Sequence, residues 1–140
     1  MARTADQARF EDLEVGHSAH FSKTVTEADV VLFAGVTGDF NPAHVDEVWA
    51  RESRFEGRVA HGMLSAAFIS TVLGTRLPGP GTIYVGQTLR FKAPVRIGDT
   101  VTARVTVREL EPERRRAHLE TVCTTQDGTV VVEGQAEVLV

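Results

Sequence analysis

The second half of the chain alternates between hydrophobic and polar residues with a period of two, which is typical of strands with one buried face. Gly86 stands inside the first of these stretches, where a glycine indicates a bulge or a bend. The pair Asp127-Gly128 separates the last two stretches and is a strong signal for a hairpin turn. The pattern therefore predicts consecutive strands at residues 83–91, 101–107, 117–123 and 130–138.

Helical spacing dominates the first half, after one alternating stretch at residues 17–25 that predicts an additional strand. Thr26 is followed by two acidic residues within one turn, and this combination favours a helix start. We expect this helix to end near Gly38, because glycine weakens a helix. The remaining elements predicted before the centre of the chain are a loop at 39–42 and a short helix at 46–52.

Residues 61–73 are nearly all apolar or small, which predicts a helix buried on every side. The Pro- and Gly-rich residues 77–81 end it. One buried helix wrapped by a twisted antiparallel sheet of about five strands accounts for all these elements. We therefore expect an α+β fold in a single domain, 1–140. Because a curled sheet leaves an unpaired edge strand, which commonly pairs across a dimer, we also expect a homodimer.

Composition narrows the function classes. The 140 residues are 42% hydrophobic and 24% charged, as in globular proteins. No stretch has the pattern of a membrane span or a signal peptide, so we expect a cytoplasmic protein with no membrane partner. A net charge of -4 argues against nucleic-acid binding. Cys123 is the single cysteine, which excludes an intrachain disulfide and a cysteine-based zinc site.

Asp39 and His44 flank the dipeptide Asn41-Pro42 just beyond the predicted end of a helix. A turn fixed by Pro42 can bring a carboxylate and an imidazole together around one water molecule, where they can divide its proton transfers. The alternative is that Asp39 caps a helix end and His44 is an ordinary surface histidine. Spacing alone leaves both interpretations open.

The start of the predicted buried helix is the second candidate site. Amides in the first turn of a helix have no intrahelical partner, and at Gly62 no side chain blocks a ligand from reaching them. Gly62 can equally be a tolerated cap. His61 either takes part in catalysis or, as is more common for a histidine at a helix start, orders the turn or bonds to the backbone. Ser70 either bonds back to a helix carbonyl or supports the catalytic loop.

Several segments together resemble the MaoC-like (R)-specific enoyl-CoA hydratases, which have the hot-dog fold. The resemblance extends from about residue 11 to the C-terminus and is densest between residues 31 and 100. The segments that carry it are GDFNPAHVD at 38–46, VAHGML at 59–64, YVGQ at 84–87 and FKAPV at 91–95, followed by Gly98-Asp99.

The resemblance implies a homodimer that adds water to a trans-2-enoyl-CoA to give the (R)-3-hydroxyacyl-CoA, or runs the reverse dehydration. It implies a coenzyme A thioester as substrate, with no metal and no redox cofactor. Asp39 and His44 match the catalytic pair of the family, and Gly62 matches its carbonyl-binding amide. Asn41 matches the residue that orders the loop, and Ser70 matches a hydroxyl near the pair.

Two other functions remain open. A hot-dog thioesterase would need a carboxylate on the buried helix, and residues 63–73 contain neither Asp nor Glu. A non-catalytic subunit that binds acyl thioesters is the second alternative. Chain-length preference, acyl carrier protein as the carrier, and the direction of the reaction are also open. Candidate pocket walls are Trp49, Phe55 and Leu64, and candidate contacts for the coenzyme's phosphates are Arg90, Lys92 and Arg96.

Overall fold

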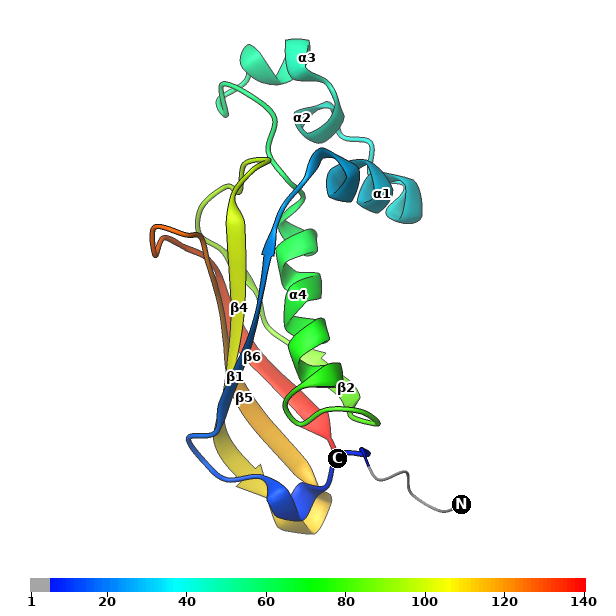
Figure 1. The fold of residues 1–140 in the computed structure, drawn as a ribbon, viewed down its shortest axis with the longest axis vertical. Helices are drawn as coiled ribbons and strands as arrows, with labels where there is room; N and C mark the ends of the chain where they lie inside the picture. Colours follow the sequence, from blue (N-terminus) through cyan, green and yellow to red (C-terminus); the bar gives the residue numbers. More distant parts are fainter. Residues whose placement is uncertain (1–5) are drawn as a thin grey trace.

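The computed structural model describes residues 6–140, and its strands form one antiparallel sheet of six strands (Figure 1). Their order across the sheet is β1-β4-β5-β6-β2, and β3 also pairs with β6. Their bounds are β1 Ser18–Thr24, β2 Ile83–Gln87, β3 Arg90–Phe91, β4 Thr100–Glu111, β5 Arg116–Thr124 and β6 Val130–Leu139. The sheet curls around the long helix α4, Gly62–Thr75, so the predicted α+β arrangement is confirmed.

The core lies between α4 and the inner face of the sheet. α4 packs against β4, β1 and β5, and its Ile69 and Val72 are fully buried. The inward residues of β4 alternate as predicted, with Val101 and Val105 also at 0% exposure. The expectation that α4 is buried on all sides is wrong within one chain, because Met63 remains 53% exposed. No helix within residues 6–140 has both the length and the apolar character to span a bilayer.

The single strand predicted at 83–91 is wrong, because the structure divides it into β2 and β3. The register with β6 shifts between Tyr84 and Gly86, which confirms the irregularity predicted at the glycine. Thr88, between the two strands, lies against Gly134 of β6. Because of this division the sheet has six strands instead of about five.

The smaller helices lie together beyond the end of the sheet, near the start of α4 (Figure 1). A capping box begins α1, since Thr26 Oγ1 accepts from the amide of Asp29 at 3.2 Å and the Asp29 carboxylate accepts from the amide of Thr26 at 2.9 Å. Gly38 ends it with a left-handed φ of 81°. These helices are α1 Glu27–Thr37, α2 Pro42–Val45 and α3 Glu47–Arg51.

Helix α2 differs from the sequence prediction, which placed Pro42 in the loop. Asn41 caps the helix, because its Oδ1 accepts from the amide of Ala43 at 3.1 Å. Proline is favourable as the first residue of a helix, where its missing N–H costs no hydrogen bond. The Asn-Pro pair therefore starts a helix at Pro42, ahead of the short helix predicted at 46–52, and His44 lies on this earlier helix.

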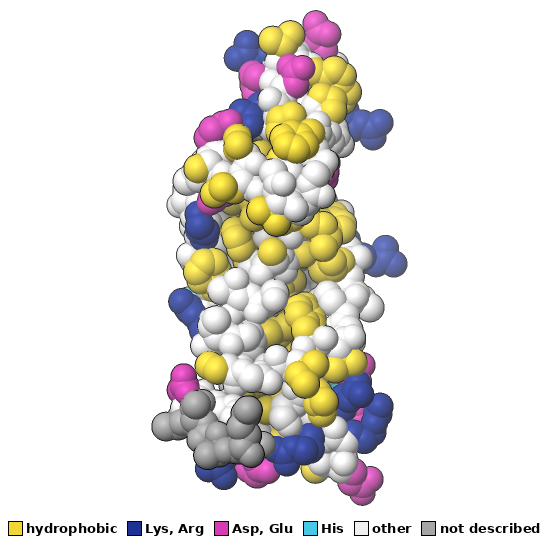
Figure 2. All heavy atoms as spheres, turned by 90° about the vertical axis from the view of Figure 1, so that its right-hand side faces the viewer, with side chains coloured by type: hydrophobic (Ala, Val, Ile, Leu, Met, Phe, Trp, Pro, Cys, Tyr) yellow, Lys and Arg dark blue, Asp and Glu magenta, His cyan; other side chains and the backbone are white. Residues whose placement is uncertain are grey.

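Large hydrophobic side chains remain exposed on the face that α1, α4 and β2 share. Figure 2 shows them gathered along this face. Ile83, Val85 and Phe91 lie on the side of the predicted strand that was expected to be buried, and in the isolated chain they are exposed. The set comprises Val31, Leu32 and Val36 of α1, Met63 of α4, Ile83, Tyr84 and Val85 of β2, and Phe91 of β3.

Candidate active site

Asp39 is placed by the end of α1. The Gly38 amide donates to the Ala34 carbonyl at 2.8 Å, and the chain then turns away from the helix axis. Asp39 Oδ1 accepts from the Asn41 amide at 3.2 Å, which folds the side chain over its own loop. Asp39 is exposed, so its carboxylate is available to a ligand.

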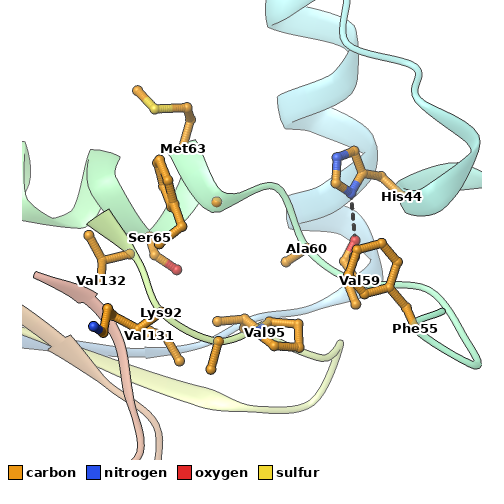
Figure 3. Close-up of a pocket in the computed structure, with 14 residues that line it drawn as sticks. His44, Phe55, Val59, Ala60, Met63, Ser65, Lys92, Val95, Val131 and Val132 are labelled. Carbon is orange, nitrogen blue, oxygen red and sulfur yellow. Dashed lines mark hydrogen bonds between the residues drawn. The ribbon is translucent and has the colours of Figure 1, made fainter. Parts of the chain in front are cut away.

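His44 is oriented by one backbone carbonyl. Its Nδ1 lies 2.7 Å from the carbonyl oxygen of Val59, and the contact is drawn in Figure 3. A carbonyl can only accept, so Nδ1 carries the proton and Nε2 of the neutral ring keeps a free lone pair. That lone pair can accept a proton from water. Arg58 supports the arrangement by donating from Nε to the His44 carbonyl at 2.6 Å while it pairs with Glu27.

The structure brings Asp39 and His44 together, as their spacing predicted, and adds His61. A carboxylate oxygen of Asp39 and one ring nitrogen from each histidine lie within 4.8 Å of one another. His61 is 2% exposed, its Nε2 donates to the Asp39 carbonyl at 2.9 Å, and its ring centre lies 3.9 Å from that of His44. A carboxylate and two imidazoles are also ligand types that zinc accepts.

The first turn of α4 presents free amides. Within residues 6–140, no acceptor bonds the amides of Gly62 or Met63, and no side chain caps this helix. A Cβ at Gly62 would lie 2.7 Å from carbons of the Phe91 ring, so any larger residue here would require the ring or the helix start to shift. The free amides and the positive end of the helix dipole suit a developing oxyanion.

A cavity of about 510 Å³ is lined by both His44 and Gly62, whereas Asp39 and His61 do not line it. His44 and Phe55 lie at one end of it, and Met63 and Val132 lie toward the other (Figure 3). Of the wall residues expected from the sequence, only Phe55 lines it. Leu64 belongs to the core, and Trp49 is 48% exposed on α3.

Ser70 lines a second cavity of about 420 Å³, which shares Met63 with the first. Phe33 also lines this second cavity, and its ring centre lies 4.8 Å from that of His61. Tyr84 lines it as well, and burial raises the pKa of its phenol to about 12. Its hydroxyl donates to the side chain of Gln87.

The three basic residues that were expected to contact the coenzyme's phosphates differ in their surroundings. Arg96 is committed to the backbone, because its guanidinium donates to the carbonyls of Phe55 and Gly57, so its expected role is wrong. Lys92 lines the first cavity, with Nζ 3.6 Å from a carboxylate oxygen of Glu133. Arg90 is exposed on β3.

Sequence reasoning missed two contributors to the site. The Val59 carbonyl orients His44, but any residue would supply a carbonyl there, so the sequence held no signal for it. Arg58 was not among the candidate site residues, because it contacts His44 only through a backbone carbonyl 14 residues earlier in the chain.

The comparisons with known proteins agree on one family. The family described as MaoC like domain matches residues 12–130. An (R)-specific enoyl-CoA hydratase from Rhodospirillum rubrum is 60% identical over 131 residues, which cover 94% of this chain and 90% of the relative. A 3-hydroxybutyryl-CoA dehydratase from Methylorubrum extorquens is 54% identical, with 94% and 83% covered.

A solved structure gives the same result. The (R)-hydratase from Aeromonas caviae, described as involved in PHA biosynthesis, superposes with a TM-score of 0.90 at 45% identity. The match covers 93% of this chain and 98% of that one. The chain therefore belongs to the MaoC-like dehydratase family and has the hot-dog fold that the sequence resemblance implied.

Proposed function

We propose that this chain is an (R)-specific enoyl-CoA hydratase, which adds water to a trans-2-enoyl-CoA or catalyses the reverse dehydration. One observation carries the proposal: His44 and the free amides of α4 open on the same apolar cavity, with the Asp39 carboxylate beside His44. The arrangement combines a proton-transfer pair with an oxyanion site. The 60% identity to a hydratase of that name supports the same reaction here.

The chemistry follows from these positions. In hydration, the oxygen of water bonds to the β-carbon, and negative charge develops on the thioester oxygen. Amides aimed at that oxygen from Gly62 stabilise the transition state more than the ground state. His44 Nε2 orients the water, Asp39 takes its proton, and a proton is delivered from the pair to the α-carbon on the same face of the double bond.

The reaction requires neither an electron acceptor nor a metal. Water adds across the double bond of the coenzyme A thioester without net redox change, so no redox cofactor is consumed. The amides of α4 supply the carbonyl polarisation for which other enzymes use a metal ion. Asn41 holds the start of α2 through its cap.

The test compares three fates of crotonyl-CoA. Hydration removes the enoyl-thioester absorbance, and the product should be oxidised by an (R)-specific but not an (S)-specific 3-hydroxyacyl-CoA dehydrogenase. Release of free coenzyme A, measured with a thiol reagent, would instead establish the thioesterase. Binding without either change would establish the non-catalytic subunit. Parallel reactions with crotonyl-acyl carrier protein identify the preferred carrier.

We further propose that the chain forms a homodimer through the exposed apolar face. The described sheet ends at β2, whose free edge lies on that face, and burying it would also cover Phe91 beside the first cavity. Edge strands with exposed apolar residues are usually paired or covered.

Ile83→Asp should therefore convert the dimer to a monomer, because Ile83 is a 56% exposed member of this face and a carboxylate there would be desolvated on association. Light scattering after size exclusion reports the mass. Val15→Asp is the matched control, since Val15 is 62% exposed outside the named face. A dimer retained by Ile83→Asp would place the interface elsewhere.

Gly62→Ala is expected to slow hydration by up to about 100-fold, the loss that a misplacement of about 1 Å can cause. The added Cβ would lie 2.7 Å from the Phe91 ring, so the helix start or the ring must shift in the cavity wall. Steady-state kinetics with crotonyl-CoA measures the loss. Combining Gly62→Ala with Phe91→Ala should recover part of it, and no recovery would show that steric conflict with Phe91 is not the cause.

A further inference from the structure

The segment that leads into α4 contacts both members of the proposed catalytic pair. The Val59 carbonyl accepts from His44 Nδ1 at 2.7 Å, and His61 Nε2 donates to the Asp39 carbonyl at 2.9 Å. The segment is itself anchored on two sides. The Val59 amide donates to the Ala43 carbonyl at 3.1 Å, and the next amide donates to the carbonyl of Val95 in the loop before β4 at 2.7 Å.

His61 is held in one tautomer by these contacts. Its Nε2 faces a carbonyl, which can only accept a hydrogen bond, so Nε2 carries the proton and Nδ1 of the neutral ring is unprotonated. Nδ1 is buried and has no hydrogen-bond partner among the described residues. An unsatisfied buried polar atom lowers stability, so its presence here calls for a compensating role.

The imidazole of His61 also lies between two rings. Its centre is 3.9 Å from the centre of the His44 ring, with 31° between the planes, and 4.8 Å from the Phe33 ring. His61 therefore touches the face of the catalytic imidazole and, through its hydrogen bond, the backbone of the catalytic carboxylate. The next residue is Gly62, whose amide is the proposed oxyanion donor.

We propose that His61 is a positioning residue. It holds Asp39 against His44, and it fixes the distance of both residues from the amides of α4. This role rests on the proposed hydratase function. His61 exchanges no proton with the substrate in this scheme. Its hydrogen bond to the Asp39 carbonyl keeps the loop after α1 from moving away from the helix start.

Two substitutions separate the hydrogen bond from the ring. His61→Phe keeps a buried ring next to His44 but removes the donor, and His61→Gln can place an amide N–H where Nε2 was. We expect kcat for crotonyl-CoA to fall by up to about 100-fold in His61→Phe, the loss that a misplacement of about 1 Å can cause, with KM nearly unchanged. His61→Gln should recover most of the loss. Equal losses in both variants would overturn the proposal.

A double-mutant cycle tests whether His61 acts through Asp39. In an Asp39→Asn background, His61→Phe should cost much less than in the wild type, because the group that it positions has already lost its function. An equal cost in both backgrounds would mean that His61 acts independently of Asp39 and would overturn the proposal. Wild-type turnover in the same assays separately decides the hydratase function.

Stability and structure give readouts that do not depend on turnover. His61→Phe removes an unsatisfied buried nitrogen and also one hydrogen bond, two changes with opposite effects on stability, so its unfolding midpoint should stay close to that of the wild type. A purely structural histidine would instead destabilise the protein when replaced. Crystal structures should show the Asp39 carboxylate displaced from His44 in His61→Phe, and an unmoved carboxylate would overturn the proposal. If His61→Phe does not fold, His61→Asn, whose amide cannot reach as far, replaces it in every measurement.

Discussion

Asp39→Asn and His44→Ala are each expected to lower the rate of crotonyl-CoA hydration by about 100-fold to 10,000-fold, the usual contribution of a well-placed acid or base. Asn keeps the size of Asp39 and can still accept from the Asn41 amide, so the loop is retained while the base is lost. Ala at position 44 removes the lone pair that holds the water. The double variant should be little slower than either single one, because the two groups act as a unit.

The controls change the same residue types outside the proposed catalytic pair. Asp46→Asn keeps the cap of α3, in which Asp46 Oδ1 accepts from the Trp49 amide at 3.0 Å, and should hydrate at the wild-type rate. His17→Ala removes a histidine of the turn before β1, where its ring pairs with Glu14 at 3.3 Å, and should be equally active. Wild-type rates in both Asp39→Asn and His44→Ala would remove this pair from the mechanism.

Gly134→Ala should destabilise the fold by at least about 3 kcal/mol, the upper part of the range for overpacking in a dense interior. A Cβ at this position would lie 1.8 Å from the Thr88 carbonyl oxygen, which is backbone and cannot rotate away. Relieving the conflict would separate Thr88 from β6. That movement would break two hydrogen bonds, from the Thr88 amide to the Gln135 carbonyl at 2.9 Å and from the Gln135 amide to Thr88 Oγ1 at 3.0 Å.

Chemical denaturation measures this free energy, with Gly86→Ala as the matched control. Gly86 is also a strand glycine, but no heavy atom lies within 4 Å of its built Cβ and its φ is not left-handed. Its replacement should change stability by no more than about 1 kcal/mol, in either direction. A Gly134→Ala protein as stable as the control would show that Thr88 does not approach β6 so closely.

Local patterns in the sequence sufficed for most of the fold. Period-two alternation placed β1, β4, β5 and β6, since alternate side chains of a strand face opposite sides. The apolar run after His61 placed α4, because a helix without a polar face must be buried. Turn and cap chemistry ended α1 at Gly38, as the structure confirms. The same loop chemistry brought Asp39 and His44 into one candidate site, because residues so close in sequence need only one turn to meet.

Tertiary structure alone decided the remaining features, because they depend on contacts between residues distant in sequence. Thr88 meets Gly134 across the sheet, and this close approach divides the strand predicted at 83–91. Arg96 was expected to contact phosphates. Its guanidinium instead donates to carbonyls about forty residues earlier in the chain and so links two segments. The tautomers of His44 and His61 follow from the carbonyls that face them. Periodicity in the sequence indicates which face of a strand or helix a side chain lies on. Which residues that side chain contacts is decided only when the sheet closes around α4.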